Sequence, residues 1–183
     1  MQLYVGNAVN KDGKAYRYAM DASRSTIMLI DSSLAELLEK GPFDLIKKEV
    51  LIFDKNKVDE FNIRYGKVEL ILTKDNGVWN VIHPEKFTAD TDKTDELLEI
   101  FLSLKASAVE EYDPKSFKEY VNKVPSLTIT LFQDSVETTF IRVGKKVGNE
   151  IFLKSGGSPP VYRILNSAIE KLKVSTDYFR KEE

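Results

Sequence analysis

His83 is the only histidine of the chain, and histidine is the side chain best suited to acid–base catalysis or metal binding near neutral pH. Either role needs partners, namely a nucleophile and a carboxylate for a triad, or further ligands for a metal. The residues around His83 supply no obvious partner, and the following Pro84 favours the end of an extended strand. We therefore expect His83 to be a structural or surface residue.

A second group that could do chemistry is a run of acids that helical spacing brings near one face, where carboxylates can bind a cation. The run consists of Asp90, Asp92, Asp95, Glu96 and Glu99. The first of these acids also suit the start of a helix, where they cap free N–H groups and complement the helix dipole. Capping and a solvated helix face explain the run more simply, so we predict no metal site.

Other catalytic and cofactor motifs are excluded by the residues themselves. The chain has no cysteine, which excludes disulfides, thiolate metal sites and cysteine nucleophiles. The glycines within 144–148 and at 156–157 are not followed by the Lys-Ser/Thr pair of a phosphate-binding loop. The segment 8–19 has alanine at both end positions, where a calcium loop requires oxygen ligands. We predict no catalytic residue, no cofactor and no metal, and therefore no enzyme.

Aromatic residues and a glycine-rich loop remain as candidates for recognition. Aromatic rings can stack on a sugar or a peptide, and mobile glycine-rich loops often carry binding residues. The candidate binding surface consists of Trp79, Tyr120, Tyr162, Gly156 and Gly157. The competing interpretation is that most aromatic residues on strands are half-buried in a sheet, and that the loop is a plain hairpin connection.

Composition narrows the class of partner. Of the 183 residues, 42% are hydrophobic and 31% are charged, with 27 basic and 29 acidic side chains and a net charge of −2. No basic stripe is present to neutralise phosphates, so nucleic acid is not an expected partner. The longest apolar stretches, such as 27–30 and 50–53, fall far short of the roughly 20 residues of a membrane span. The segment is expected to be soluble, with no direct membrane insertion.

Hydrophobic periodicity predicts an α+β fold in which antiparallel meander sheets pack with two or three helices. The best helix covers 90–105, and a short buried strand is expected at 50–53. Asp12-Gly13 predicts a tight hairpin turn. Before a shorter helix, Asp31, Ser32 and Ser33 offer capping oxygens, and Ser33 and Glu36 have the spacing of a capping box. Leu34, Leu37 and Leu38 are expected to form its apolar face.

The order of short motifs predicts a partial internal repeat. Val5-Gly6 recurs as Val143-Gly144, each followed by a polar turn and a strand that carries Tyr16 or Phe152. After a loop, the segment 30–34 recurs as 165–169, and 43–49 has a counterpart in 178–182. We therefore expect residues 1–49 to be the end of a first repeat unit and 50–183 to be a second unit, in one compact or two-lobed globule.

Several of these motifs together resemble the bacterial domain of unknown function 4340 family. The residues that carry the resemblance include Phe53-Asp54, Gly77-Val78-Trp79, Ala89-Asp90, the segment 120–125, Val143-Gly144 and the segment 158–162. One departure is Val121, at a position where the family has glycine after the tyrosine. The family has no attributed catalytic residues, so the resemblance supplies none.

The resemblance also implies a cellular setting. Members of this family typically lie outside the cytoplasm behind an N-terminal membrane anchor, and some are encoded beside transporter components. We expect an extracytoplasmic, non-enzymatic binding or scaffold module, whose partner is another protein of a membrane-associated assembly such as a transporter. The alternatives are a carboxylate-dependent hydrolase acting on carbohydrate or peptidoglycan, and a carrier of a small ligand or lipid.

Overall fold

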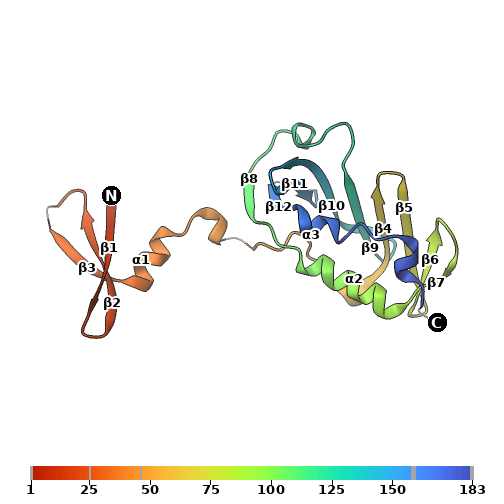
Figure 1. The fold of residues 1–183 in the computed structure, drawn as a ribbon, viewed down its shortest axis with the longest axis horizontal. Helices are drawn as coiled ribbons and strands as arrows, with labels where there is room; N and C mark the ends of the chain where they lie inside the picture. Colours follow the sequence, from red (N-terminus) through yellow and green to blue (C-terminus); the bar gives the residue numbers. More distant parts are fainter. Residues whose placement is uncertain (1, 25, 46, 158–159, 182–183) are drawn as a thin grey trace. The chain divides into compact units, whose positions relative to one another are not determined.

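The computed structural model describes residues 2–24, 26–45, 47–157 and 160–181. The chain divides into two compact units, Met1–Lys47 and Lys48–Glu183 (Figure 1). This division lies two residues before the boundary at 49 that the motif pattern predicts.

The first unit is a three-stranded antiparallel sheet followed by a short helix and one 3-10 turn. Its elements are β1 (Leu3–Lys11), β2 (Lys14–Asp21), β3 (Ile27–Asp31), α1 (Ser32–Glu39) and η1 (Pro42–Leu45). The strands pair in the order β1-β2-β3. Asp12 and Gly13 connect β1 to β2 with φ angles of 51° and 75°, as the Asp-Gly pair predicts for a tight hairpin.

Helix α1 differs from its sequence-based description at its cap and on its apolar face. Asp31, and not Ser33, caps the helix, because its carboxylate accepts a hydrogen bond from the Ser33 N–H at 2.9 Å. Ala35 is fully buried, whereas the expected apolar residues Leu34, Leu37 and Leu38 are 47%, 58% and 54% exposed. Helix α1 packs on a sheet of three strands. This sheet buries Ala35, but Leu34, Leu37 and Leu38 remain exposed to solvent.

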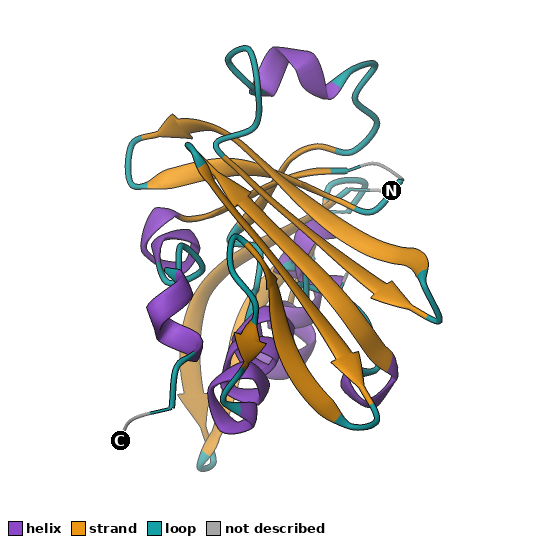
Figure 2. Cartoon of the chain, turned by 90° about the vertical axis from the view of Figure 1, so that its right-hand side faces the viewer, coloured by secondary structure: helices purple, strands orange, loops and turns teal. Residues whose placement is uncertain are grey.

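The second unit is built on a nine-stranded antiparallel sheet with the order β7-β6-β5-β4-β9-β10-β11-β12-β8 (Figure 2). Its strands are β4 (Val58–Tyr65), β5 (Val68–Asp75), β6 (Val78–His83), β7 (Phe87–Thr88), β8 (Ala108–Glu111), β9 (Leu127–Gln133), β10 (Val136–Val147), β11 (Glu150–Ser155) and β12 (Val161–Leu165). Its helical elements are η2 (Lys55–Lys57), α2 (Thr91–Ser103), η3 (Phe117–Tyr120), α3 (Asn166–Glu170) and η4 (Thr176–Phe179). A mainly antiparallel sheet with a few helices confirms the α+β class.

An aromatic cluster forms the centre of this unit. The ring of Phe61 on β4 lies 5.3 Å from the ring of Trp79 on β6 and 5.9 Å from that of Phe101 on α2. The ring of Phe179 in η4 lies 6.4 Å from the same Phe61 ring. All four side chains are fully buried. The inward-facing residues of the strands and the apolar face of α2 therefore pack in one core. Large aromatic side chains contribute much of the packing energy of such a core.

One local prediction is corrected. Residues 50–53 are not a strand: Glu49 makes only an isolated bridge with Lys105, and the Val50 N–H donates to the Leu104 carbonyl at 3.1 Å. Residues Phe117–Tyr120 form the single 3-10 turn η3. Strands β7 and β8 are not predicted, because two and four residues are too short to show a period.

Candidate functional site

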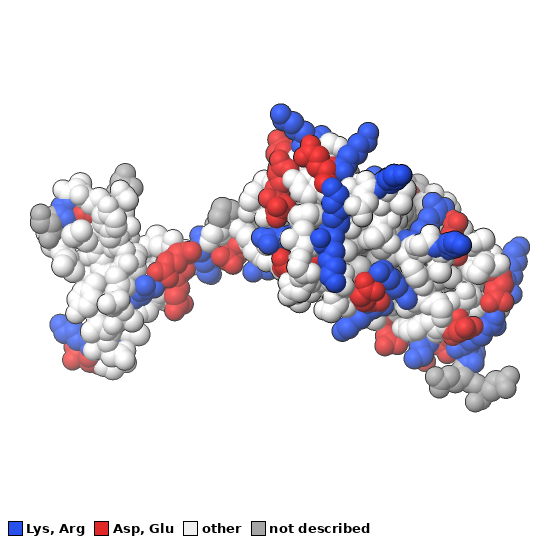
Figure 3. All heavy atoms as spheres, turned by 45° about the horizontal axis from the view of Figure 1, so that its top comes forward, with Lys and Arg blue, Asp and Glu red and all other residues white. Residues whose placement is uncertain are grey.

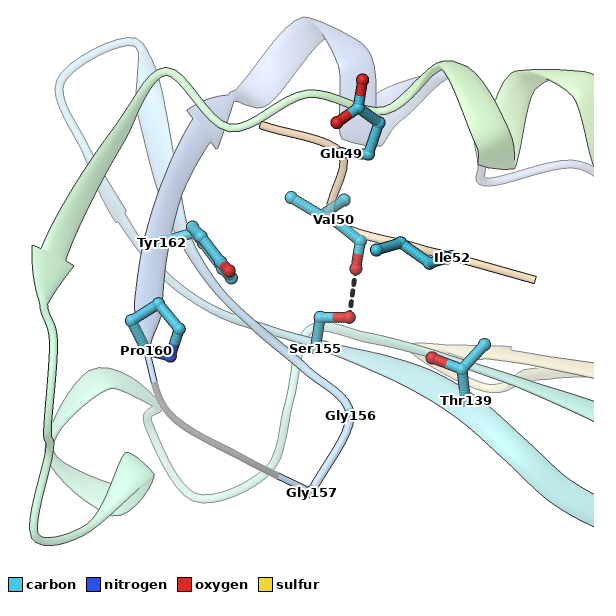
Figure 4. A pocket seen from close by; sticks show the side chains of 9 residues that line it. All are labelled: Glu49, Val50, Ile52, Thr139, Ser155, Gly156, Gly157, Pro160 and Tyr162. Atoms are coloured by element: carbon cyan, nitrogen blue, oxygen red, sulfur yellow. Dashed lines mark hydrogen bonds between the residues drawn. The ribbon is translucent and has the colours of Figure 1, made fainter. Parts of the chain in front are cut away.

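Three of the five candidate surface residues lie together. Gly156, Gly157 and Tyr162 line one pocket of about 290 Å³ on the second unit (Figure 4). The other residues that line it are Glu49, Val50, Ile52, Thr139, Ser155 and Pro160. Ser158 and Pro159, which belong to the same predicted loop, lie outside the described residues.

The chemistry of this pocket is limited to a few isolated polar groups. The Ser155 hydroxyl donates to the Val50 carbonyl, which ties the loop to the segment before β4. Burial raises the pKa of the Tyr162 phenol. Glu49 is the one acid among the lining residues, whereas a carboxylate-dependent hydrolase requires a pair. The hydrolase alternative stays a prediction.

Trp79 takes no part in a surface, which corrects its place among the candidates. Its side chain is fully buried in the aromatic core. Side chains alternate between the two faces of β6, and Trp79 and Val81, two residues apart, both point to the buried face. Its role is therefore in packing.

Tyr120 is half-buried and connects the η3 segment to the sheet. Its ring lies edge-on to Phe152 of β11 at 5.1 Å and stacks on Phe117 at 6.1 Å. Its hydroxyl donates to the Glu111 carboxylate of β8. This hydrogen bond, assisted by burial and by the negative charge of Glu111, raises the pKa of Tyr120 to about 12.

Gly144 explains why the backbone at Tyr120 can approach so closely. Strand β10 has a bulge between Val143 and Lys146, and Gly144 lies within it. A Cβ atom on Gly144 would clash with the Tyr120 carbonyl oxygen and would lie 3.0 Å from its carbonyl carbon. The absent side chain of this glycine therefore leaves room for the η3 segment to cover the bulge.

The first unit contains the same bulge. Strand β1 shifts register between Val5 and Ala8, around Gly6, and a Cβ atom on Gly6 would lie 3.5 Å from the Tyr18 Cβ. On β10 the corresponding distance, from Gly144 to the Phe152 Cβ, is 3.3 Å. Tyr18 therefore corresponds to Phe152, which corrects the match of Tyr16 with Phe152 made from the sequence.

The later elements of the two units correspond at a constant spacing. Strands β3 and β12 begin at Ile27 and Val161, helices α1 and α3 at Ser32 and Asn166, and turns η1 and η4 at Pro42 and Thr176. The spacing is 134 residues in each pair, one fewer than the motif comparison indicates. The sequence analysis did not single out Gly6 or Tyr18 as candidate residues, although the recurring Val-Gly pair includes Gly6.

Burial differs sharply between corresponding residues. Ile27 is 66% exposed whereas Val161 is fully buried, and Leu38 is 54% exposed whereas Leu172 is fully buried. Figure 3 shows few charged atoms on the visible face of the smaller unit, while both signs of charge are spread over the larger one. The first unit thus exposes apolar side chains at positions that the second unit covers.

One part of this apolar surface is concave. A hollow of about 200 Å³ lies beside Gly6 and Tyr18 on the sheet of the first unit. We call it the Gly6 hollow, and its lining residues are Tyr4, Val5, Gly6, Tyr18, Ala19, Met20 and Ile27. It occupies the position at which Tyr120 and its neighbours cover Gly144 and Phe152 in the second unit.

The remaining candidates lie at the end of β6 and along α2. His83 is exposed at the end of β6 and pairs with Ile71 of β5. Asp90 caps α2 by accepting from the Asp92 N–H at 2.9 Å, and Glu99 pairs with Lys55 at 2.6 Å. Over the part of the chain that the structure describes, no group of three or more acids and histidines is arranged to hold a metal.

The model of the domain of unknown function DUF4340 matches twice, at residues 1–81 and 79–183. The chain belongs to the DUF4340 family. Two matches to one family model are consistent with a partial unit followed by a full unit. No curated protein and no solved structure matches the DUF4340 chain.

Along the described residues of this DUF4340 chain, no helix combines the length and apolar character that are needed to cross a bilayer.

The two bulge glycines give a matched test of the close approach. We expect Gly144→Ala to destabilise the second unit by about 1–3 kcal/mol, because the new methyl group must displace the Tyr120 backbone. The methyl group of Gly6→Ala would meet only Tyr18, at an ordinary contact distance of 3.5 Å from its Cβ, so this substitution should change stability by less than about 0.5 kcal/mol. Urea unfolding of the second unit can be followed by Trp79 fluorescence, and amide exchange reports the first. Equal effects of the two substitutions would contradict the assignment.

Tyr120 should also ionise late. Because its folded-state pKa of about 12 exceeds the ordinary value of 10.0, the stability that it contributes is complete below pH 10 and is lost as the pH rises toward 12. Titration of tyrosinate absorbance should show a late-ionising component that Tyr120→Phe removes in part. Tyr178, with a pKa raised to about 12 by burial and by the charge of Glu96, and Tyr162, whose pKa burial also raises, contribute the rest. A titration that Tyr120→Phe leaves unchanged above pH 10 would disprove this.

Proposed function

We propose that this DUF4340 chain is a non-enzymatic binding or scaffold module that binds another polypeptide through its first unit. The observation that carries the proposal is the exposure of Ile27 and Leu38 at positions where Val161 and Leu172 are fully buried. Burying one such side chain is worth about 1.5–3 kcal/mol. A partner that covers this surface therefore has a substantial driving force, and exposed apolar patches commonly mark binding sites.

The second unit indicates what kind of polypeptide would fit. In its sheet, β9 pairs with the outer edge of β10 and β8 pairs with the outer edge of β12. The corresponding strands β1 and β3 have no such neighbour in the three-stranded sheet of the described residues. Unpaired strand edges accept an added strand, and their backbone groups supply the hydrogen bonds. The partner segment should therefore have the pattern of residues 48–138, with a strand like β9 that pairs antiparallel with β1.

The cellular setting belongs to the same proposal. We place the module outside the cytoplasm, anchored to the membrane in the full-length protein, as an auxiliary part of a transporter-type assembly. Membership of the DUF4340 family supports this setting through the typical location of its members. No contact among the described residues favours the hydrolase alternative over binding.

A fusion tests the proposed binding directly. A copy of residues 48–138 is joined in front of residue 1. Gly6 corresponds to Gly144, so residue 1 takes the place of residue 139 and the hairpin length is preserved. In β10, Ile141 and Val143 pair with Ile129 and Leu127. We expect amide hydrogen exchange near Leu3 and Val5 to slow by about tenfold or more.

A matched control uses the same fusion with Ile129→Lys and Leu131→Lys in the copy only. Both residues are fully buried in β9 of the second unit, so the control copy should fail to protect β1. Unchanged exchange near Leu3 and Val5 in the unmodified fusion would refute the proposal, whether or not the copy itself becomes folded, because the first unit would then have failed to accept its complementary segment.

A further inference from the structure

We infer that a polar pocket on the outer face of the nine-stranded sheet binds a neutral, hydroxyl-rich ligand, of the class of one sugar ring of a glycan. The pocket belongs to the second unit alone, so this inference is independent of the polypeptide binding proposed for the first unit. We call it the Asn62 pocket. Its volume is about 220 Å³, and its lining residues are Asn62, Arg64, Thr128, Thr130, Phe132 and Glu137.

The alternation of side chains along the strands places this pocket on the face opposite the aromatic core. On β4, Phe61 and Ile63 are fully buried, so Asn62 and Arg64 point to the other face of the sheet. Strand β9 repeats the pattern, because the two residues that flank Thr130 are also fully buried. The core therefore holds the floor of the pocket in place from behind.

Strand register then brings the lining residues side by side. Asn62 pairs with Thr130 across β4 and β9, and Phe132 pairs with Glu137 across β9 and β10. The register of β10 shifts directly after Glu137, and such bulges bend a strand and change the direction of its side chains. All three strands have a paired neighbour on each side, so an extended peptide cannot add here as a further strand. Side chains alone determine what the pocket binds.

Asn62 supplies a polar group that the protein leaves unsatisfied. Its Oδ1 atom is buried and has no hydrogen-bond partner among the described residues. Buried polar atoms are normally paired, because an unpaired one keeps the cost of its lost hydration. The terminal torsion of an asparagine side chain is soft, so the carboxamide can turn its oxygen toward the pocket. A ligand hydroxyl that donates to this oxygen removes the cost.

The other lining groups suit hydroxyls in the same way. A sugar hydroxyl both donates and accepts a hydrogen bond, and the hydroxyls of Thr128 and Thr130 can do the same. Phe132 is half-buried beside them and offers an apolar ring on which the C–H face of a sugar ring can pack. An apolar wall beside a few convergent polar groups is the usual construction of a small-molecule site.

The charges at the pocket disfavour an ionic ligand. The Arg64 guanidinium is already paired, because its Nε donates to Glu69 Oε1 at 2.7 Å and a second nitrogen lies 2.5 Å from the same oxygen. A phosphate or carboxylate would have to compete with Glu69 and would also meet the carboxylate of Glu137. A metal cation would be repelled by Arg64. Unfavourable charge contacts of this kind select against the wrong ligand, and a neutral ligand meets neither of them.

The size of the pocket limits its occupant to one ring. The volume of about 220 Å³ exceeds the roughly 150 Å³ of an apolar protein cavity that binds benzene. It is smaller than the roughly 300–1,000 Å³ of sites that enclose a drug-sized ligand. One six-membered ring with its hydroxyls therefore fills the pocket, and any further sugar rings extend into solvent.

Nuclear magnetic resonance titration of the full chain tests the pocket with defined probes. The neutral probes are chitotriose, cellotriose, maltotriose and mannotriose, and the charged probes are sodium phosphate and calcium chloride. We expect at least one trisaccharide, at about 10 mM or less, to shift the side-chain amide of Asn62 and the backbone amides of Thr128 and Thr130.

Two nearly isosteric variants remove the proposed hydrogen-bonding groups. Asn62→Leu and Thr130→Val should each weaken trisaccharide binding by about threefold to tenfold, as expected for the loss of one or two hydrogen bonds. Thr73→Val is the matched control, because Thr73 pairs with Glu60 on the same face of the sheet and does not line the pocket. Replacing an unpaired buried acceptor by an apolar group does not cost stability, so Asn62→Leu should unfold in urea no earlier than the unmodified chain.

Three results would overturn the inference. The first is that none of the four trisaccharides shifts these amides. The second is that phosphate or calcium alone shifts them, which would identify an ion site. The third is that trisaccharide binding keeps its full strength in both Asn62→Leu and Thr130→Val, which would place the sugar elsewhere. The fusion with residues 48–138 concerns the first unit, so the two proposals fail or stand separately.

Discussion

The need to cover apolar side chains on a sheet governs both units of this DUF4340 chain. The second unit satisfies it with nine strands, whose inner face packs the aromatic cluster around Phe61 against α2 and η4. The first unit has three strands and one short helix with which to meet the same need. Residues such as Ile27 stay exposed. Because hydrophobic stabilisation scales with the apolar area removed from water, we expect the first unit to be less stable than the second.

The close approach of Tyr120 to Gly144 links this global requirement to one residue. A bulge places the glycine where a neighbouring segment can lie directly on the strand, and the bulge recurs around Gly6. Sequence and backbone geometry of the first unit are thus arranged for a cover that its own three strands do not supply. This arrangement is the basis on which we propose recognition of a complementary polypeptide.

Local sequence signals predicted much of the fold. Asp12-Gly13 specified a hairpin and Asp90 specified the start of α2, because turns and caps depend on a few neighbouring residues. Burial required knowledge of distant partners. Trp79 looked like a surface candidate, but it is fully buried against Phe61 in the aromatic cluster. Leu38 looked like a core residue although it is exposed in the first unit. The site around Gly6 became visible only when one unit served as the template for the other.

The central claim is that the first unit lacks the cover that the second unit has. Native-state hydrogen exchange of the unmodified chain tests it most directly, by comparing the amides of β2 with the corresponding amides of β11. Slower exchange in β11 by about a hundredfold or more, about 3 kcal/mol in opening free energy, is the expected result. Equal protection of the two strands would show that the first unit is as stable as the second, and would contradict the account.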